Sequence, residues 1–319
     1  MNELSQLSIE ELKEKLALHA EYLQNRTTGE RLTLRNTLLQ SLHIKAPDTN
    51  NSRIYLEDIT LENVHFQDCT LENICFSCAK IRDTTWDSCV LRQCIFRDTT
   101  LINTTFNRTN LSYTVWNNIE FTKLRTTRST FLRNTINNST FNTCTLSYPT
   151  NFYACDITNT TFPNSAIGGL IQDSDLYNTH FYNCDTGCLT LAATPSNQMI
   201  QYQNDKWPVL ISPNWIQIGC KGYIFDKWMR FTNDQINAMS STAIEWYMRH
   251  KDIIAILHAH LLAQLLEPNM KHRTQFPTNT PPTNPLTTTP QNKFIDTQTK
   301  QFSTKPLSIT RYRNSTSNE

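Results

Sequence analysis

Large apolar residues recur at every fifth position along the middle of the chain. Counting from residue 56, eighteen of nineteen such positions are large and apolar, and only Thr126 breaks the series. The stripe consists of Leu56, Leu61, Phe66, Leu71, Phe76, Ile81, Trp86, Leu91, Phe96, Leu101, Phe106, Leu111, Trp116, Phe121, Thr126, Phe131, Ile136, Phe141 and Leu146. Neither a helix nor an alternating strand keeps a five-residue period on one side, so the backbone must turn at each repeat.

Two further stripes accompany the first. The position two residues before each large residue is mostly small or β-branched, and we expect it to point inward as well. The position two residues after is Asp or Asn at nine of nineteen places, which are Asp58, Asn63, Asp68, Asn73, Asp83, Asp98, Asn103, Asn118 and Asn138. Asp and Asn side chains bond to nearby backbone and tolerate turn geometry, so these residues should occupy the corners.

This repeat resembles that of the pentapeptide-repeat family, over roughly 140 residues. The resemblance implies a mainly β protein: a right-handed quadrilateral β-helix, or solenoid, in which four repeats make one square coil. Residues twenty apart should then stack, for example Leu56, Phe76, Phe96, Trp116 and Ile136. Thr often replaces the usual Ala of the family, so we expect looser packing at the corners.

The five-residue register changes twice. Leu146 and Phe152 are six residues apart with Pro149 between them, and Gly168-Gly169 precedes a return to the original phase. We expect a bulge near Pro149 and a loop or kink near Gly168, both projecting from the wall.

The ends of the chain differ in texture from the repeats. Residues 1–30 should form a capping helix, which Ser8 and Glu11 begin as a capping box, and residues 31–192 the β-helix. Residues 193–267 predict a small α+β unit, with strands at 199–203, 207–211 and 214–218 and helices at 223–228, 233–239 and 242–266. Its pattern of Ile216, Gly219, Trp228 and Trp246 resembles a C-terminal extension of phage and bacterial pentapeptide-repeat proteins. Residues 268–319, rich in Pro and Thr, predict a disordered, basic tail.

Candidate chemistry is sparse. Ten cysteines are spread through a long chain, and Cys69, Cys89, Cys94, Cys144 and Cys155 fall on the small inward stripe, so we expect free thiols. The single Cys-x-x-Cys at Cys75 and Cys78 lacks further ligands for a metal. Three histidines, His250, His258 and His260, should lie on a solvated helix surface. We therefore predict no cofactor, no metal site and no enzymatic activity.

Charge is uneven along the repeats. The chain carries a net charge of +1, and residues 51–190 hold thirteen acidic and ten basic residues. Acidic residues dominate 57–87, whereas the basic candidates for partner binding are Arg108, Lys123, Arg125, Arg128 and Arg133. This polarity would orient a partner, and the alternative interpretation is a merely solvated wall.

These observations favour a non-enzymatic protein-interaction scaffold in the cytoplasm, which binds a protein partner of undetermined identity and forms a homodimer through the C-terminal unit. We also expect no signal peptide and no membrane-spanning segment. Some pentapeptide-repeat proteins mimic DNA and bind type II topoisomerases such as gyrase, which is the first alternative. The weak net charge argues against that mimicry, and no strongly basic patch supports direct nucleic-acid binding. A viral or bacterial effector or assembly protein is the second alternative.

Overall fold

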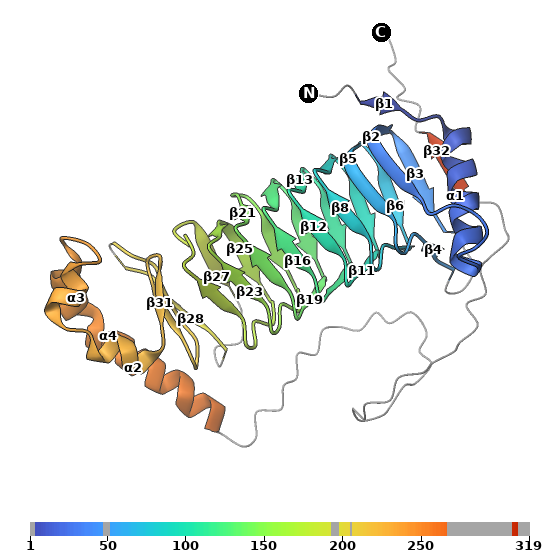
Figure 1. Ribbon diagram of the computed structural model, residues 1–319. Coiled ribbons are helices and arrows are strands. Elements are labelled where there is room, and N and C mark those ends of the chain that lie inside the picture. Colours follow the sequence, from blue (N-terminus) through green and yellow to red (C-terminus); the bar gives the residue numbers. More distant parts are fainter. Residues whose placement is uncertain (1–3, 47–51, 193–197, 205, 267–307, 312–319) are drawn as a thin grey trace, which may run out of the picture.

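The computed structural model describes residues 4–46, 52–192, 198–204, 206–266 and 308–311 of the chain. A parallel β-solenoid forms its centre, and each regular turn has four short strands (Figure 1). One such turn consists of β10 (Val90–Arg92), β11 (Ile95–Arg97), β12 (Thr100–Ile102) and β13 (Thr105–Asn107), after which β14 (Asn110–Ser112) pairs with β10. The predicted four-sided β-helix is confirmed.

The remaining solenoid strands repeat this pattern on both sides of that turn. They are β2 (Thr33–Gln40), β3 (Leu42–Lys45), β4 (Ile54–Tyr55), β5 (Thr60–Gln67), β6 (Thr70–Glu72), β7 (Ile74–Cys75), β8 (Lys80–Arg82), β9 (Thr85–Asp87), β15 (Val115–Asn117), β16 (Glu120–Thr122), β17 (Arg125–Thr127), β18 (Thr130–Leu132), β19 (Thr135–Asn137), β20 (Thr140–Asn142), β21 (Thr145–Leu146), β22 (Asn151–Tyr153), β23 (Thr161–Pro163), β24 (Ala166–Ile167), β25 (Gly169–Gln172), β26 (His180–Tyr182) and β27 (Leu189–Ala192).

The five-residue stripe fills the interior of the solenoid. Phe96 pairs with Trp116 and Trp116 with Ile136, and the rings of Phe96 and Trp116 stack with centroids 4.1 Å apart. Even the exception, Thr126, is fully buried, and its hydroxyl lies 2.8 Å from that of Thr150. The predicted columns are therefore present, and they leave a solid core.

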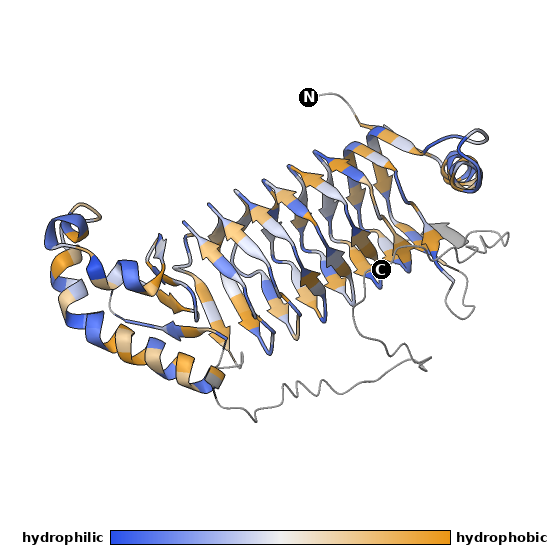
Figure 2. Cartoon of the chain, turned by 60° about the horizontal axis from the view of Figure 1, so that its bottom comes forward, coloured by the Kyte–Doolittle hydropathy of each residue, from blue (hydrophilic) through white to orange (hydrophobic). Residues whose placement is uncertain are grey.

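The corners have left-handed backbone geometry. All nine Asp and Asn residues expected there have φ between 50° and 62°. The same geometry occurs at Arg108, Lys123, Arg128 and Arg133. Long basic side chains do not form the local backbone hydrogen bonds that favour this geometry for Asp and Asn. Backbone bonds between turns hold these corners, as where the Arg108 N–H donates to the Thr127 carbonyl at 2.8 Å. Figure 2 shows hydrophilic residues at these corners and hydrophobic residues along the strands.

The corners are not loosely packed, contrary to our expectation. The Thr99 hydroxyl donates to the Phe76 carbonyl at 2.8 Å, and the Thr109 hydroxyl donates to the Trp86 carbonyl at 2.9 Å. Cys144 directs its thiol at the Phe121 carbonyl in the same way, at 3.4 Å. Threonine replaces alanine here because its hydroxyl satisfies a carbonyl of the preceding turn.

The two changes of register compensate each other. Phe131 pairs with Phe152, twenty-one residues later, whereas Phe152 pairs with Ile171, nineteen residues later. The extra residue makes the expected bulge, and Tyr148 is exposed there. Near Gly168, however, no loop projects: both glycines are buried, and a Cβ on Gly169 would lie 1.9 Å from the Thr150 carbonyl oxygen. The glycines allow the next turn to close over the bulge.

The N-terminal end is covered by helix α1 (Ile9–Gln24) and by β1 (Ser5–Gln6), which pairs with β2. Ser8 and Glu11 form the predicted capping box. Leu12 and Leu16 are buried against the first turn, and His19 Nδ1 accepts the Leu32 N–H at 3.1 Å. The opening coil expected after residue 31 is present, since Leu34 pairs with Leu61.

The other end carries a four-stranded antiparallel sheet of β28 (Ile200–Tyr202), β29 (Val209–Ile211), β30 (Ile216–Ile218) and β31 (Lys221–Tyr223), with helices α2 (Phe225–Arg230), α3 (Asn233–Asn237) and α4 (Ala243–Leu266). The prediction that a helix starts at Tyr223 was wrong, because Tyr223 ends a hairpin strand that pairs with Ile216.

Three glutamines of this C-terminal unit seal the last turn of the solenoid. Gln198 accepts the Leu176 N–H at 2.7 Å, Gln201 accepts the Leu191 N–H at 2.8 Å, and Gln217 donates to the Cys184 carbonyl at 2.8 Å. Trp215 joins the core of the solenoid. The C-terminal unit is therefore the second cap of the rod.

Of the predicted tail, residues 268–307 and 312–319 lie outside the described residues. Ser308–Arg311 form strand β32, which pairs antiparallel with β3 at the N-terminal end of the solenoid (Figure 1). The sequence predicts a disordered tail here and does not predict this strand.

Candidate protein-binding surfaces

The basic candidates lie on two adjoining sides of the solenoid. Lys123 and Arg128 occupy the corners on either side of β17, and Arg125 is the first residue of that strand. Arg108 lies one turn earlier in the column of Arg128, and Arg133 lies one corner further on. The structure thus brings Lys123, Arg125 and Arg128 together on one side, which we call the basic face.

Neighbours engage some of these cations. The Arg108 guanidinium donates to both carboxylate oxygens of Asp87, at 2.8 and 3.0 Å. Arg133 donates to the Tyr113 hydroxyl at 3.0 Å and lies over its ring. Arg108 therefore neutralises one acidic group of the wall, and the exposed Lys123 and Arg128 are better placed to meet a partner.

The cysteines do not converge. All ten are free, and Cys75 is buried whereas Cys78 is exposed. Burial raises the pKa of the Cys94, Cys144 and Cys155 thiols to about 12, so they remain protonated. Within the described residues no group of three or more His, Cys, Asp or Glu side chains is placed to hold a metal.

Two of the three helix histidines are packed, contrary to our expectation. His258 is 5% exposed, stacks on Phe225 and bonds through Nε2 to the Pro213 carbonyl at 3.0 Å. His250 lies 2.7 Å from the Tyr202 hydroxyl through Nδ1. Only His260 lies on the exposed side of α4. Because α4 packs across the sheet, these rings fix the helix in place.

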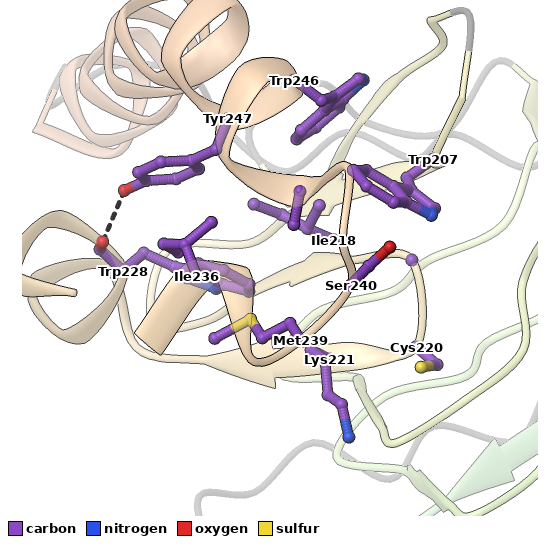
Figure 3. A pocket seen from close by; sticks show the side chains of 12 residues that line it. Trp207, Ile218, Cys220, Lys221, Trp228, Ile236, Met239, Ser240, Trp246 and Tyr247 are labelled. Carbon is purple, nitrogen blue, oxygen red and sulfur yellow. Dashed lines mark hydrogen bonds between the residues drawn. The ribbon is translucent and has the colours of Figure 1, made fainter. Parts of the chain in front are cut away.

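An apolar pocket lies between the hairpin of β30 and β31 and the helices α3 and α4 (Figure 3). Its lining comes from Trp207, Ile218, Gly219, Cys220, Lys221, Trp228, Ile236, Met239, Ser240, Ala243, Trp246 and Tyr247. The rings of Trp207 and Trp246 meet edge to face, with centroids 5.1 Å apart. Gly219 has φ 56°, and a Cβ there would lie 3.2 Å from the Trp207 ring, so glycine lets the hairpin approach.

Three of the four aromatic lining residues have their side-chain polar atoms in hydrogen bonds. Trp246 donates to Asn204 Oδ1 at 3.0 Å, Trp228 donates to the Ile216 carbonyl at 2.8 Å, and Tyr247 donates to the Trp228 carbonyl at 2.5 Å. Burial also raises the pKa of Tyr247 to about 12. The rings therefore present apolar faces, and the pocket selects for an apolar group.

Its size limits the ligand. The pocket holds about 90 Å³ of free volume. Small-molecule sites usually hold roughly 300–1,000 Å³. A single apolar side chain suits this volume better than a cofactor does. Lys221 and Lys206 are exposed at the edge, with Lys206 Nζ 4.6 Å from the Trp207 ring centroid.

The sequence predicts a strand at Trp207 and helices at Trp228, Trp246 and Tyr247, but it predicts no pocket between them. One signal was available: four of the six tryptophans, Trp207, Trp215, Trp228 and Trp246, fall in the C-terminal unit. Tryptophan is enriched in the central contacts of protein interfaces. The pairing of Trp207 with Trp246 across 39 residues could not be read from local periodicity.

Helix α4 also exposes large apolar residues on its side away from the sheet, where the exposed Asp252 lies between Met248 and Ile256. Met248 and Ile256 are 62% and 68% exposed, and Leu262 lies on the same side. Ala255, Ala259 and Ala263 follow one another at intervals of four residues along it. We call the six apolar residues the outer face of α4.

The chain is similar to proteins that contain pentapeptide repeats. Residues 74–112 match the family model of pentapeptide repeats, in eight copies. No curated protein matches the chain. A solved structure of QnrB1, a plasmid-mediated fluoroquinolone resistance protein, is 15% identical, with 52% of this chain and 91% of that chain covered and a TM-score of 0.32.

Two further solved structures are similar to the chain. HetL, a pentapeptide-repeat protein involved in heterocyst differentiation regulation in the cyanobacterium Nostoc sp. strain PCC 7120, is 11% identical, with 55% of this chain and 90% of HetL covered and a TM-score of 0.33. ORF18 of Geobacillus virus E2 is 12% identical, with 60% and 58% covered and a TM-score of 0.17.

The matched repeats and the four-sided parallel solenoid together show that the chain contains pentapeptide repeats folded as a parallel β-solenoid. Among the described residues, no helix has the length and apolar character that crossing a bilayer requires.

Proposed function

We propose that this protein is a non-enzymatic scaffold that binds a partner protein through its C-terminal unit. The apolar pocket between Trp207 and Trp246 carries the proposal, because it is lined by aromatic faces and has room for one side chain of a partner. The solid interior of the solenoid supports the same interpretation, since a filled rod offers its outer wall for recognition and no cleft for chemistry. The cytoplasmic location of the protein remains a prediction.

The partner should present one large apolar residue with acidic neighbours. The apolar residue would enter the pocket, and the acidic neighbours would meet Lys206 and Lys221 at its edge. The basic face of the solenoid, Lys123, Arg125 and Arg128, would favour the same negative partner and would act mainly on the rate of association.

Affinity capture from the native host tests this proposal with full-length variants. Ser240→Phe fills the pocket from its edge, and Ser241→Phe adds the same ring at the neighbouring exposed position. We expect the first variant to lose the captured partner and the second to retain it. Equal capture by both variants would contradict the pocket. Deletion of residues 196–319 would be unsuitable, because it removes Trp215 and the glutamines that close the solenoid.

We also propose that two copies associate through the outer face of α4. The helix has 24 residues, or about 36 Å of length, and its alanines permit close approach of a second helix. Ile256→Glu should convert a dimer to a monomer in light scattering, whereas Tyr177→Glu changes an exposed apolar residue on the solenoid wall and should leave the mass unchanged. A monomeric mass for the wild-type chain would rule the dimer out.

The topoisomerase alternative has weaker support. Residues 51–190 carry a net charge of −3, and Arg108 neutralises Asp87 on the wall. A phosphate lattice has a far denser negative charge. We therefore expect the purified protein neither to inhibit gyrase supercoiling nor to protect the enzyme from inhibitors, and either activity would favour the alternative.

A further inference from the structure

Strand β3 has neighbours of two kinds. Along its inner edge β3 pairs parallel with β6, and Ile44 lies opposite Leu71. The strands of the other solenoid turns pair in parallel with their neighbours in the same way. Its outer edge pairs antiparallel with β32, with Leu42 opposite Arg311, Ile44 opposite Ile309 and Lys45 opposite Ser308. Among the described residues, β32 is the one antiparallel neighbour of a solenoid strand.

The other terminal edges are covered by nearby parts of the chain. β2 is covered by β1, which precedes it by some thirty residues, and the last turn is covered by the glutamines that follow it. β4 has only two residues and therefore exposes little edge. The cover of β3 comes instead from the opposite end of the chain and consists of four residues.

We propose that the outer edge of β3 is a binding site for an extended peptide segment of a partner protein, and that β32 is the chain's own competitor for it. Strand addition to an open edge uses backbone hydrogen bonds for affinity and alternate side chains for specificity. The proposal deepens the scaffold function, on which it rests, by naming a second contact and the form of the ligand.

The register defines that ligand. Leu42 and Ile44 are 2% and 5% exposed and face the core, whereas His43 and Lys45 lie on the outer side with Glu72, whose carboxylate is 3.9 Å from the Lys45 ammonium. Residues directly opposite each other in an antiparallel pair lie on the same side of the sheet. The partner segment should therefore place an apolar residue opposite Ile44 and polar residues opposite His43 and Lys45.

Helix α1 bounds the site on one side. β32 lies beside α1 as well as beside β3 at this end of the solenoid (Figure 1). A segment bound there would be held between the helix and the strand, in the place that β32 occupies along all four residues of β3. Partner binding thereby requires release of the tail.

The test uses the full chain and a labelled peptide of residues 305–314. In one variant, Ile309→Pro and Thr310→Pro together remove two successive N–H groups, one of which must point toward β3 in an antiparallel pair. The control variant carries Thr297→Pro and Gln298→Pro, outside β32. Fluorescence anisotropy measures peptide binding, and hydrogen exchange measures protection of the β3 amides.

We expect the peptide to bind the variant with released β32 at least about tenfold more tightly than the wild-type or control chains, because the tethered strand competes at high effective concentration. Protection of β3 should fall in that variant and return with peptide. A peptide with both prolines should not bind. Equal binding to all three chains, or binding of the proline peptide, would overturn the proposal.

Solution mass gives an independent result. If the wild-type chain forms oligomers that the two prolines in β32 abolish, β32 occupies a second copy, and the competition within one chain is refuted. Failure of the scaffold function is separately visible, because the Ser240→Phe experiment reports on the pocket and leaves β3 unchanged.

Discussion

Replacement of Trp116 by Phe provides a quantitative test of the solenoid core. Trp116 is fully buried, and its ring stacks on Phe96 at an interplanar angle of 5°. Its indole N–H, however, has no hydrogen-bond partner among the described residues. A buried donor without a partner costs about 1–3 kcal/mol.

The two effects of Trp116→Phe oppose each other. Loss of the fused ring removes apolar burial equivalent to about two methylene groups, or roughly 1.6 kcal/mol at about 0.8 kcal/mol each. Removal of the unpaired N–H restores a similar amount. We therefore expect the free energy of unfolding to change by less than about 1 kcal/mol, whereas truncation of a buried Trp to Ala costs about 3–5 kcal/mol.

Urea unfolding followed by circular dichroism measures this change, since the substitution alters tryptophan fluorescence. Two variants serve as controls. Phe96→Leu removes ring area from the same column without removing a donor, and Trp228→Phe removes an indole whose N–H donates to the Ile216 carbonyl at 2.8 Å. Both should destabilise by about 2 kcal/mol or more. If Trp116→Phe destabilises as much as these two, the unpaired N–H carries no penalty and the reasoning fails.

Three further predictions concern the thiols, the bulge and the cap. Iodoacetamide at pH 8 should label the exposed Cys78, Cys188 and Cys220 in the native protein, because burial excludes the reagent from the other seven and raises the pKa of thiols such as Cys184 to about 12; mass spectrometry that finds native labelling of Cys184 would contradict this. Gly169→Ala should destabilise the protein by about 3 kcal/mol or more in urea unfolding, because the added Cβ would overlap the Thr150 carbonyl. The control, Gly187→Ala, should be nearly neutral, because its Cβ would meet only the Asp185 carboxylate at 3.3 Å. Similar destabilisation by both variants would refute the account of the bulge. Burial lowers the pKa of His19 below 6.5, so the contribution of His19 to stability is complete above pH 6.5 and falls as the pH decreases. Hydrogen exchange at the Leu32 amide, which donates to His19, should therefore accelerate below that pH. His19→Gln should remove this pH dependence.

The sequence was sufficient to predict the solenoid because its determinants repeat. Each inward residue, such as Phe96, has the same role as its neighbour twenty positions away, and each corner residue, such as Asn103, needs the same backbone geometry. The capping box of Ser8 and Glu11 is equally local. Patterns of this kind survive without knowledge of the tertiary structure.

The candidate sites could not be predicted in the same way. The pocket depends on Trp207 meeting Trp246, and the packing of His258 depends on a carbonyl at Pro213, far from it in sequence. Strand β32 is paired with the opposite end of the chain, and four polar and β-branched residues in a Pro-rich tail carry no periodic signal. Tyr223 was misassigned because a hairpin at Gly219 takes it into a strand before the helix begins.

The glutamines at the last turn determine the length of the rod. Every regular turn is a template for another one, so a turn without a cover would offer its free amides and carbonyls to a strand from a neighbouring molecule. Gln198, Gln201 and Gln217 use side-chain amides in place of the next turn's backbone, and growth by stacking stops there. Insertion of whole twenty-residue turns upstream would lengthen the solenoid without disturbing these glutamine contacts. The length of the solenoid can therefore change independently of the residues that end it.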